Sequence, residues 1–291
     1  MASMRDIKRR KSSIESTQQI TKAMKLVSTV RLQRARQRAE NSKAYFNCMY
    51  DTVTSVLAKA SNVNHPYLKA GSSNRKAVVV ITSNRGLAGG YNSGIIKLIT
   101  RGNFDKDELD IYALGKKGKE FLARYGYTIK EDDCDKIDDP VYADAMGISK
   151  RLLESYVSGE IGEIYLAYTA FKNTVVHDPK LIKLLPVEPE ESQDSEDSSK
   201  IEKGATALMN FEPEDEEALD LIIPKYVTSL IYGGMVESVA SENGARMQAM
   251  DSATSNAEDM IAKLSLQYNR ARQGSITQEL TEIIGGASAI S

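Results

Sequence analysis

Glycine and proline are both missing from one long stretch at the start of this 291-residue chain. Neither residue occurs between Met1 and His65, although an average helix runs only about 11 to 12 residues. From Lys225 onward the chain holds six glycines and no proline. This distribution predicts a long helix at each end of the chain. Helices of such length need a partner along much of their surface.

The N-terminal stretch carries small and apolar residues at helical spacing. From Leu32 they recur in alternating steps of three and four, as in the seam of a coiled coil. The positions of this seam are Leu32, Ala35, Ala39, Ser42, Phe46, Met49, Val53, Val56 and Ala60. A second set upstream keeps one helical face but does not share that frame: Ile7, Ile14, Ile20, Met24 and Val27. We therefore expect the seam to shift near Ser28–Arg31.

The C-terminal segment repeats the same spacing. Its seam positions are Met250, Ala253, Ala257, Ile261, Leu264, Tyr268, Ala271 and Ser275. Two matching helices predict an antiparallel coiled coil between an N-terminal helix within residues 1–62 and a C-terminal helix within 214–291. Because the seam uses Ala, Ser and Met more than Leu, the pair buries little apolar surface per turn and needs outside partners. Gly233, Gly234 and Gly274 keep open the alternative of shorter helices in an ordinary bundle.

Between the two helices, residues 75–212 have the pattern of an α/β domain. The expected strands are Ala77–Ser83, Asp110–Leu114, Thr128–Lys130, Glu163–Phe171 and Leu181–Val187. The expected helices are Ser93–Thr100, Lys116–Tyr125 and Ala143–Ser158. This alternation predicts a mostly parallel, Rossmann-like sheet with helices on its faces. The predicted fold class is therefore α/β plus long helices.

Charges are strongly segregated along the chain, although its net charge is only −2. Met1–Lys43 holds twelve Lys or Arg against three acidic residues, and Glu188–Glu217 holds twelve acidic residues against two lysines. The acidic run at 188–203 predicts a mobile surface loop, with contact to the basic helix as the alternative. Nucleic-acid binding by the basic helix is disfavoured because no aromatic residue precedes Tyr45 and the pI is about 5.9.

The chain has no sign of a membrane span or of a cysteine framework. Its apolar runs fall short of the roughly 18 to 20 residues that cross a bilayer. Cys48 and Cys134 lie far apart in the sequence, without a C-x-x-C motif or a neighbouring histidine. This spacing predicts neither a disulfide framework nor a zinc site, and it fits a reducing compartment.

A glycine-rich stretch, Ser83–Gly94, follows the first predicted strand and precedes a helix, where nucleotides often bind. The dinucleotide pattern G-x-G-x-x-G fails because position 88 is alanine. The P-loop pattern fails because Ile95 and Ile96 stand where Lys and Ser or Thr hold phosphate and magnesium. We interpret the glycines as permitting a tight turn and close packing rather than phosphate binding.

No catalytic or metal site emerges from the remaining polar residues. His65 and His177 are isolated from each other, and each lies near a proline in an expected turn. The acidic residues between Asp132 and Asp139 lack the glycine and ligand spacing of an EF-hand, so we expect them to be solvated. Catalysis by this chain alone is not expected.

Five stretches, in consistent order, carry motifs of one family. Ile7–Arg38 contains I-x-R-R-x-x-S-I-x-S-T-x-x-I-T-K-A-M-x-x-V, and Ser83–Asn92 is similar to S-D-R-G-L-C-G-G-x-N. Glu242–Met250 reads E-N-G-A-R-M-Q-A-M, Leu266–Gln273 reads L-Q-Y-N-R-A-R-Q, and Ile276–Glu279 reads I-T-Q-E. On these motifs, which span nearly the whole chain, the sequence closely resembles the γ subunit of F-type ATP synthases.

Two positions depart from the family pattern, with Asn84 in place of Asp and Ala88 in place of the frequent Cys. The element that holds them is structural in the family, so neither change weakens the resemblance. The closely spaced cysteine pair of the plant-plastid γ subunit is not found in this sequence. Thiol regulation of that kind is therefore not expected.

The resemblance implies a central-stalk rotor. The helix pair would form an asymmetric shaft inside a ring of three α and three β subunits, and the α/β domain would lie near the membrane with ε and the c-ring. Flow of protons or sodium ions would turn ring and shaft, and the shaft would drive ATP synthesis at the β subunits. The chain would be present once per complex and bind no nucleotide, other cofactor, metal or nucleic acid. It would lie peripherally at the cytoplasmic face of a bacterial plasma membrane.

The resemblance also implies which residues make the rotor contacts. Arg272, Gln273 and Thr277 match family positions that contact the catch loops of β. Lys22, Met24 and Arg246 match the coupling region near the lower rim of β. These are torque and coupling contacts rather than catalytic groups.

The end of the chain fits an apolar bearing. After Glu282 no ionisable side chain remains, and Ile283, Ile284, Ala287 and Ile290 form an apolar tip. Such a tip can turn in an apolar sleeve without breaking a directional ion pair at each step. The alternative to a rotor is a coiled-coil adaptor with a nucleotide-binding α/β domain, or more distantly a Rossmann-type enzyme. Tight nucleotide binding by the isolated chain would favour that alternative.

Overall fold

The computed structural model describes residues 4–59, 65–69, 71, 73–102, 104–174, 176–187 and 215–290. Two helices dominate it: α1 spans Met4–Lys59 and α5 spans Asp215–Ile290. Both predicted long helices are confirmed, and Gly233, Gly234 and Gly274 lie within α5 without ending it. The acidic run 188–203 and the seam position Ala60 lie outside the described residues, as do the side chains of Ser42 and Val56.

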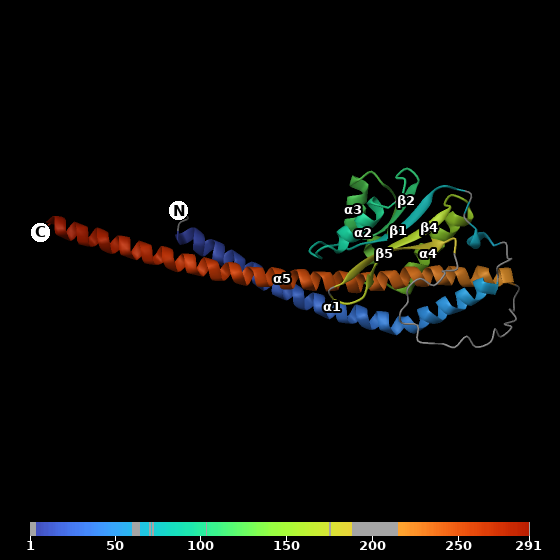
Figure 1. Ribbon diagram of the computed structural model, residues 1–291, viewed down its shortest axis with the longest axis horizontal. Coiled ribbons are helices and arrows are strands. Elements are labelled where there is room, and N and C mark those ends of the chain that lie inside the picture. Colours follow the sequence, from blue (N-terminus) through green and yellow to red (C-terminus); the bar gives the residue numbers. More distant parts are fainter. Residues whose placement is uncertain are drawn as a thin grey trace. The chain divides into compact units, whose positions relative to one another are not determined.

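A five-stranded sheet lies between these helices in the sequence (Figure 1). Its strands are β1 (Lys76–Ile81), β2 (Leu109–Leu114), β3 (Thr128–Asp132), β4 (Glu163–Phe171) and β5 (His177–Leu185). They are ordered β3-β2-β1-β4-β5, and all neighbours are parallel except β4 and β5. The predicted fold class is confirmed, including a mostly parallel sheet.

The last strand begins earlier than predicted. The sequence pattern places its start at Leu181, whereas β5 pairs with β4 from His177 onward. Pro179 lies opposite Thr169 in this ladder, and proline is tolerated there because β5 is an edge strand. His177 therefore lies in a strand, and its predicted place in a turn is wrong.

Helices cover both faces of the sheet. Helices α2 (Tyr91–Thr100) and α3 (Lys116–Arg124) pack on the face that presents Val78 and Val80 of β1. Helix α4 (Tyr142–Val157) and the residues Leu219–Met235 of α5 pack on the face that presents Ala77 and Val79. Coverage on both sides explains why β1 reads as a continuous apolar run, since each of its alternating faces is buried.

The chain divides into two compact units. One consists of Met1–Val30 with Arg246–Ser291, and the other of Arg31–Ala245. The first unit is a pair of helical segments, and the second contains the sheet, its covering helices and the adjoining parts of α1 and α5. The predicted domain boundaries, at 1–62, 75–212 and 214–291, divide the chain by secondary structure rather than by compactness. These boundaries stay predictions.

The seam of α1 keeps a single frame. From Ile7 the buried and half-buried positions continue in steps of three and four through Lys11, Ile14, Gln18, Thr21, Lys25, Ser28, Leu32 and Ala35. The shift predicted near Ser28–Arg31 is wrong. Polar side chains occupy the seam there, while Ile20 and Val27 are 60% and 55% exposed. The apolar pattern therefore pointed to the outer face of the helix in this stretch.

The seam of α5 is confirmed. Met250 and Ala257 are buried, and the other predicted positions from Ala253 to Ser275 are half-buried. In the second unit, Phe46 of α1 lies against Tyr232 of α5, with ring centroids 6.2 Å apart. The two helices therefore pair within each unit.

Candidate functional site

The helix pair of the first unit is fixed in antiparallel register by three polar contacts. The Gln18 amide donates to Glu258 over 2.9 Å, and the Lys25 ammonium lies 2.6 Å from Asp251. Between them the Thr21 and Thr254 hydroxyls are buried and 2.8 Å apart. This register places Met4, the first residue of α1, opposite Arg272 of α5.

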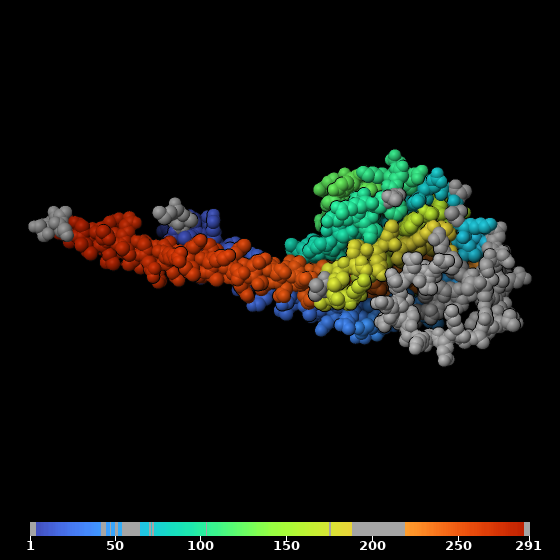
Figure 2. Space-filling view, in the orientation of Figure 1, coloured from blue at the N-terminus to red at the C-terminus, as the bar shows by residue number. Residues whose placement is uncertain are grey.

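Beyond Arg272, α5 therefore continues past the start of α1. Figure 1 and Figure 2 show this end of α5 in orange to red, running beyond the blue start of α1. Every residue from Ile276 to Ala287 is exposed. Apolar side chains are among them, with Leu280 exposed by 54% and Ile283 by 68%.

The predicted contact residues on this end are all presented at the surface. Arg272, Gln273 and Thr277 are exposed, and Gln273 and Thr277 share a helical face because they are four residues apart. The Thr277 hydroxyl donates to the Gln273 carbonyl over 2.9 Å. Of the predicted tip, Ile283, Ile284 and Ala287 are exposed. The side chain of Ile290 lies outside the described residues.

The other predicted contact residues lie further along the pair. Lys22 is exposed and Met24 is half-buried, both next to the seam of α1. Arg246 is only 7% exposed, so most of its guanidinium is enclosed within the described part of the chain. The antiparallel register opposes Arg246 to Val30, more than one helical turn from Met24. The structure thus separates Arg246 from the other two residues along the helix axis.

Sequence reasoning missed an exposed apolar surface on α1. Ile20, Leu26, Val27 and Val30 are 60%, 65%, 55% and 49% exposed, on a helix whose seam is largely polar in this stretch. The signal was present in the sequence, because Ile20 and Val27 stand out from the seam frame, but it was read as a change of seam. Exposed apolar side chains gathered on one segment mark an interaction surface.

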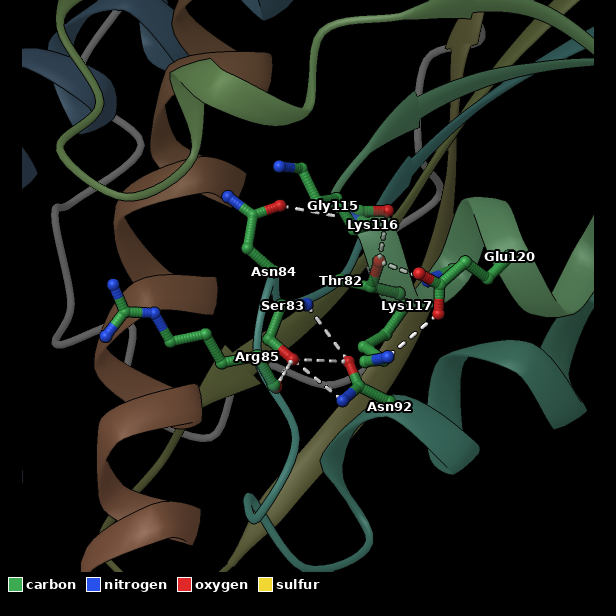
Figure 3. A network of polar contacts seen from close by, with 10 residues as sticks. Thr82, Ser83, Asn84, Arg85, Asn92, Gly115, Lys116, Lys117 and Glu120 are labelled. Carbon is green, nitrogen blue, oxygen red and sulfur yellow. Dashed lines mark hydrogen bonds and ion pairs between the residues drawn. The ribbon is translucent and has the colours of Figure 1, made fainter. Parts of the chain in front are cut away.

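The glycine-rich stretch after β1 forms a hydrogen-bonded turn (Figure 3). The Ser83 amide and hydroxyl both lie 3.0 Å from the Asn92 side-chain oxygen. The Asn84 side chain donates to the Cys134 carbonyl over 2.7 Å and accepts from the Lys116 amide over 3.0 Å. These contacts tie the ends of β1 and β2 together.

Two nearby features pack against this turn. Gly115, at φ +131°, approaches so closely that an added Cβ would lie 2.1 Å from the Thr82 carbonyl oxygen. At the other end of the turn, Ala88 and Tyr91 are buried together with Ala245 of α5. The predicted tight turn is supported by Gly89, whose φ is +54°, but the predicted close packing is wrong for Gly86 and Gly89, where an added Cβ would meet no atom within 4 Å. In open α/β sheets the same position often holds a ligand.

The acidic residues between Asp132 and Asp139 are exposed as predicted, except for the half-buried Asp133, and several of them form ion pairs. Asp132 pairs with Lys119, Asp133 pairs with Arg151, and Asp139 pairs with Arg38. The side chain of Asp135 is 98% exposed and lies 3.9 Å from Lys116, and Asp138 is exposed as well. Within the described residues, no group of His, Cys, Asp and Glu has the geometry of a metal site.

The two histidines occupy different surroundings. His65 is buried, with Nε2 lying 3.1 Å from Asp220 and Nδ1 accepting from the Tyr67 amide. It caps a short 3-10 helix, Pro66–Leu68, and links it to α5. His177 lies in β5, where burial lowers the pKa of its ring. Both are isolated from each other, as predicted.

These observations define a class of protein in which an α/β domain is inserted between two long helices. The helices pair in antiparallel register and expose polar and apolar side chains along the pair. A sequence model described as ATP synthase matches residues 3–290. The chain belongs to the ATP synthase gamma chain family.

Relatives of known identity cover the full chain. It is 64% identical over 290 residues to the ATP synthase gamma chain of Lachnoclostridium phytofermentans, with 100% of both chains covered. It is 43% identical to that of Alkaliphilus metalliredigens, covering 99% and 98% of the two chains. The sodium ion specific ATP synthase gamma chain of Acetobacterium woodii is 38% identical, with 99% and 98% covered.

Solved structures share the fold. A chain of the Euglena gracilis mitochondrial ATP synthase, in a structure of OSCP, F1 and c-ring, aligns with a TM-score of 0.65 and 19% identity. The alignment covers 99% of this chain and 94% of that one. A chain from the central stalk and c-ring of the Tetrahymena thermophila enzyme gives a TM-score of 0.56 and 23% identity over 80% of this chain and 99% of that one. No helix in the described ranges is both long and apolar enough to cross a membrane.

Proposed function

We propose that this chain acts as the central rotor shaft of an ATP synthase, coupling transmembrane ion flow to ATP synthesis at the β subunits. The observation that carries the proposal is the end of α5 beyond Arg272, where a helix without α1 beside it exposes apolar side chains. Lone helices of this length are marginal in water, so the segment needs an enclosing partner. A ring of α and β subunits provides such a sleeve.

Within that sleeve, we assign the polar contacts to Arg272, Gln273 and Thr277. All three are exposed on α5 and free to meet a partner surface as the shaft turns. Exposed polar contacts are weak individually, of the order of 0 to 1 kcal/mol for an ion pair, so they form and break without deep angular traps. They suit the catch loops of β.

The apolar tip provides the bearing. Ile283, Ile284 and Ala287 are exposed, and Ile290 continues the same apolar composition. Apolar contact is non-directional, so its energy changes little as the helix rotates inside an apolar sleeve. The tip therefore supports rotation rather than transmitting torque.

Coupling at the lower rim of β is assigned to Lys22, Met24 and Arg246. Lys22 and Met24 lie beside the exposed apolar surface of α1 around Ile20 and Val27. Arg246 lies deeper, at 7% exposure, and we assign to it the orientation of the helix pair as well as rim contact.

The same proposal covers the remaining partners and the location. The sheet domain meets ε and the c-ring, one copy is present per complex, and the chain is held peripherally at the cytoplasmic face of a bacterial plasma membrane. We also propose that the chain carries no catalytic site and binds no nucleotide cofactor, because the glycine-rich stretch Ser83–Gly94 matches neither the dinucleotide nor the P-loop pattern. Membership of the gamma chain family supports this proposal.

Met24→Lys tests the coupling assignment. The substitution adds a charge beside the apolar surface of α1, so we expect complexes that assemble but pump fewer ions for each ATP hydrolysed. The matched control is Gln19→Lys, which adds the same charge at an exposed position elsewhere on α1. ATP hydrolysis and ion pumping are measured on the same membranes. An equal loss of both activities, with their ratio unchanged, counts against the assignment.

Isolation of the full-length chain tests the assignment of nucleotide binding to other subunits. We expect no saturable ATP or ADP binding to the chain alone, and recovery of binding when α and β subunits are added. Tight binding by the chain alone would favour a nucleotide-dependent adaptor instead.

A further inference from the structure

A cavity lies within the α/β unit, between the start of α2 and the β4–β5 pair. Its volume is about 250 Å³, and it is lined by Gly90, Tyr91, Gly94, Thr169, His177 and Pro179. Glycines leave this space open, because a Cβ at Gly94 would approach Pro179 to 3.5 Å. One water occupies about 30 Å³ of liquid volume, so the cavity is large enough for a polyatomic ligand.

Two side chains on the cavity wall have buried polar atoms with no partner among the described residues. Thr169 is 1% exposed, and its hydroxyl makes no hydrogen bond there. Both ring nitrogens of His177 are also buried and make no hydrogen bond with any described residue. A buried polar group without a hydrogen bond costs about 1–3 kcal/mol. A ligand that supplies those bonds is therefore stabilised in the cavity.

The start of α2 contributes favourable electrostatics for an anion. Helix α2 has ten residues, and its N-cap, Gly90, offers no side chain to satisfy the amides of the first turn. Such a helix end carries a partial positive charge of roughly half an elementary charge and commonly holds oxyanions. Gly90 and Tyr91 place that end on the cavity wall.

We propose that this cavity binds a small tetrahedral oxyanion, such as inorganic phosphate or sulfate, between the start of α2, the Thr169 hydroxyl and the His177 ring. The hydroxyl and one ring N–H donate to the anion, and the helix end supports its charge. The site is independent of the rotor contacts assigned above.

Binding is coupled to a proton on His177. Burial lowers the pKa of this ring, so the ring is neutral near pH 7 without an anion beside it. A bound anion favours the imidazolium and raises that pKa, so the anion and a proton bind together.

Charges on the elements around His177 make this proton necessary. On β5, Asp178 pairs with Lys172 at 3.1 Å, and Lys180 is exposed. On α5, Glu237 accepts from the Phe171 amide over 3.4 Å, and Glu242 is 8% exposed. Tyr91 of α2 also lines the cavity. None of these described groups hydrogen-bonds to the His177 ring, so the imidazolium itself supplies the positive charge that faces the anion.

Histidine NMR of the full-length chain tests the proposal, since the chain contains only two histidines. Inorganic phosphate is titrated against chloride at constant ionic strength and at several pH values. We expect a saturable shift of the His177 ring signals, an upward move of the His177 pKa by about one unit, and no change at His65. Sulfate should compete for the same site.

Two variants separate binding from general structure. Thr169→Val is nearly isosteric and should weaken phosphate binding by roughly tenfold, because it removes one hydrogen bond to a charged group. Thr100→Val, on α2 with its hydroxyl bonded to the Ile96 carbonyl, is the matched control and should bind as the unaltered chain does. His177→Gln should abolish the pH dependence of binding.

Three results would overturn the proposal. They are a linear, unsaturable response of His177 to phosphate, equal shifts with chloride, and unchanged affinity in Thr169→Val when its thermal unfolding matches that of the parent. Any of them would mean that the cavity holds only water.

Discussion

The hydroxyl oxygens of Thr21 and Thr254 lie 2.8 Å apart and buried between α1 and α5. Each hydroxyl also lies near a carbonyl of its own helix, Gln18 at 3.0 Å and Met250 at 2.8 Å. With one proton each, one hydroxyl donates across the pair and the other to its own helix. The pair thus joins the helices without an ion pair.

Thr21→Val should lower the free energy of unfolding of the first unit by about 1 kcal/mol, since it removes the cross-helix hydrogen bond. The double variant that carries both Thr21→Val and Thr254→Val should recover most of this lost stability. Two apolar groups of the same shape pack there without leaving a hydroxyl unsatisfied. Urea unfolding of the two single variants and the double variant measures the coupling. Strictly additive losses would show that the hydroxyls do not interact.

Adjacent glycines in α5 should respond in opposite directions to alanine. A Cβ at Gly233 would meet Phe46 at 3.5 Å, which is ordinary contact, so Gly233→Ala should stabilise by up to about 1 kcal/mol through helix propensity. A Cβ at Gly234 would lie 3.0 Å from Leu166 and 3.4 Å from Tyr168. Overpacking in the Gly234→Ala variant should therefore destabilise the folded chain by about 1–3 kcal/mol. The higher helix propensity of alanine offsets only part of this loss.

Thermal unfolding of the two glycine variants, at one concentration and pH, checks this pair. Each variant is the control for the other, because both make the same chemical change in the same helix. Stabilisation by both substitutions would mean that the close approach of α5 to the sheet at Gly234 is absent.

The two cysteines should differ in reactivity with pH. Cys48 is exposed, whereas burial and, secondarily, Asp132 raise the pKa of Cys134 from 9.0 to about 11. The thiolate is the reactive form, so near pH 8 a maleimide should label Cys48 and leave Cys134 unmodified. Raising the pH toward 9 should still leave Cys134 unlabelled, because its pKa is raised to about 11.

Thiol ionisation also affects stability in a defined direction. Because the folded pKa of Cys134 is raised, the unfolded chain loses this proton first, between its ordinary value of 9.0 and about 11. The contribution of Cys134 to folding is therefore complete below pH 9 and falls as the pH rises through that window.

Peptide mass spectrometry of maleimide-labelled protein, with Cys48→Ser as control, checks the predicted difference in reactivity between the two cysteines. Early labelling of Cys134 in the folded chain would contradict its burial.

A charge in the apolar tip should impair the assembled enzyme and leave the free chain unaffected. Ile283 is 68% exposed, so Ile283→Lys should change the unfolding free energy of the chain by less than about 0.5 kcal/mol. In a complex, the ammonium would be desolvated inside an apolar sleeve, and ATP hydrolysis should fall. Ile283→Val is the conservative control. Full activity of Ile283→Lys would show that the tip is not enclosed.

Much of the fold followed from periodicity and from the positions of glycine and proline. The steps of three and four in α5, from Met250 to Ser275, were sufficient because apolar side chains fill that seam. They failed in α1, where Gln18, Thr21, Lys25 and Ser28 occupy the seam and apolar residues face outward. A polar seam has no periodic apolar signal, so only its partner helix identifies it.

The roles of the candidate-site residues stay predictions, and the structure adds their surroundings. Exposure of Arg272 and Thr277 agrees with contact roles, whereas the burial of Arg246 depends on side chains distant in sequence. The pairing of Asp139 with Arg38 likewise joins residues about a hundred positions apart, which no local pattern predicts. The pocket beside His177 arises from three elements meeting and had no signal in the sequence.

Rotation of the helix pair within the α and β subunits is the central claim, and single-molecule imaging tests it most directly. The exposed thiol of Cys48 provides the attachment point for a bead, since Cys134 is buried. In complexes immobilised through β, ATP should drive continuous rotation of the bead in one direction, and halting the bead should halt hydrolysis. Steady ATP hydrolysis with a stationary bead would contradict the account.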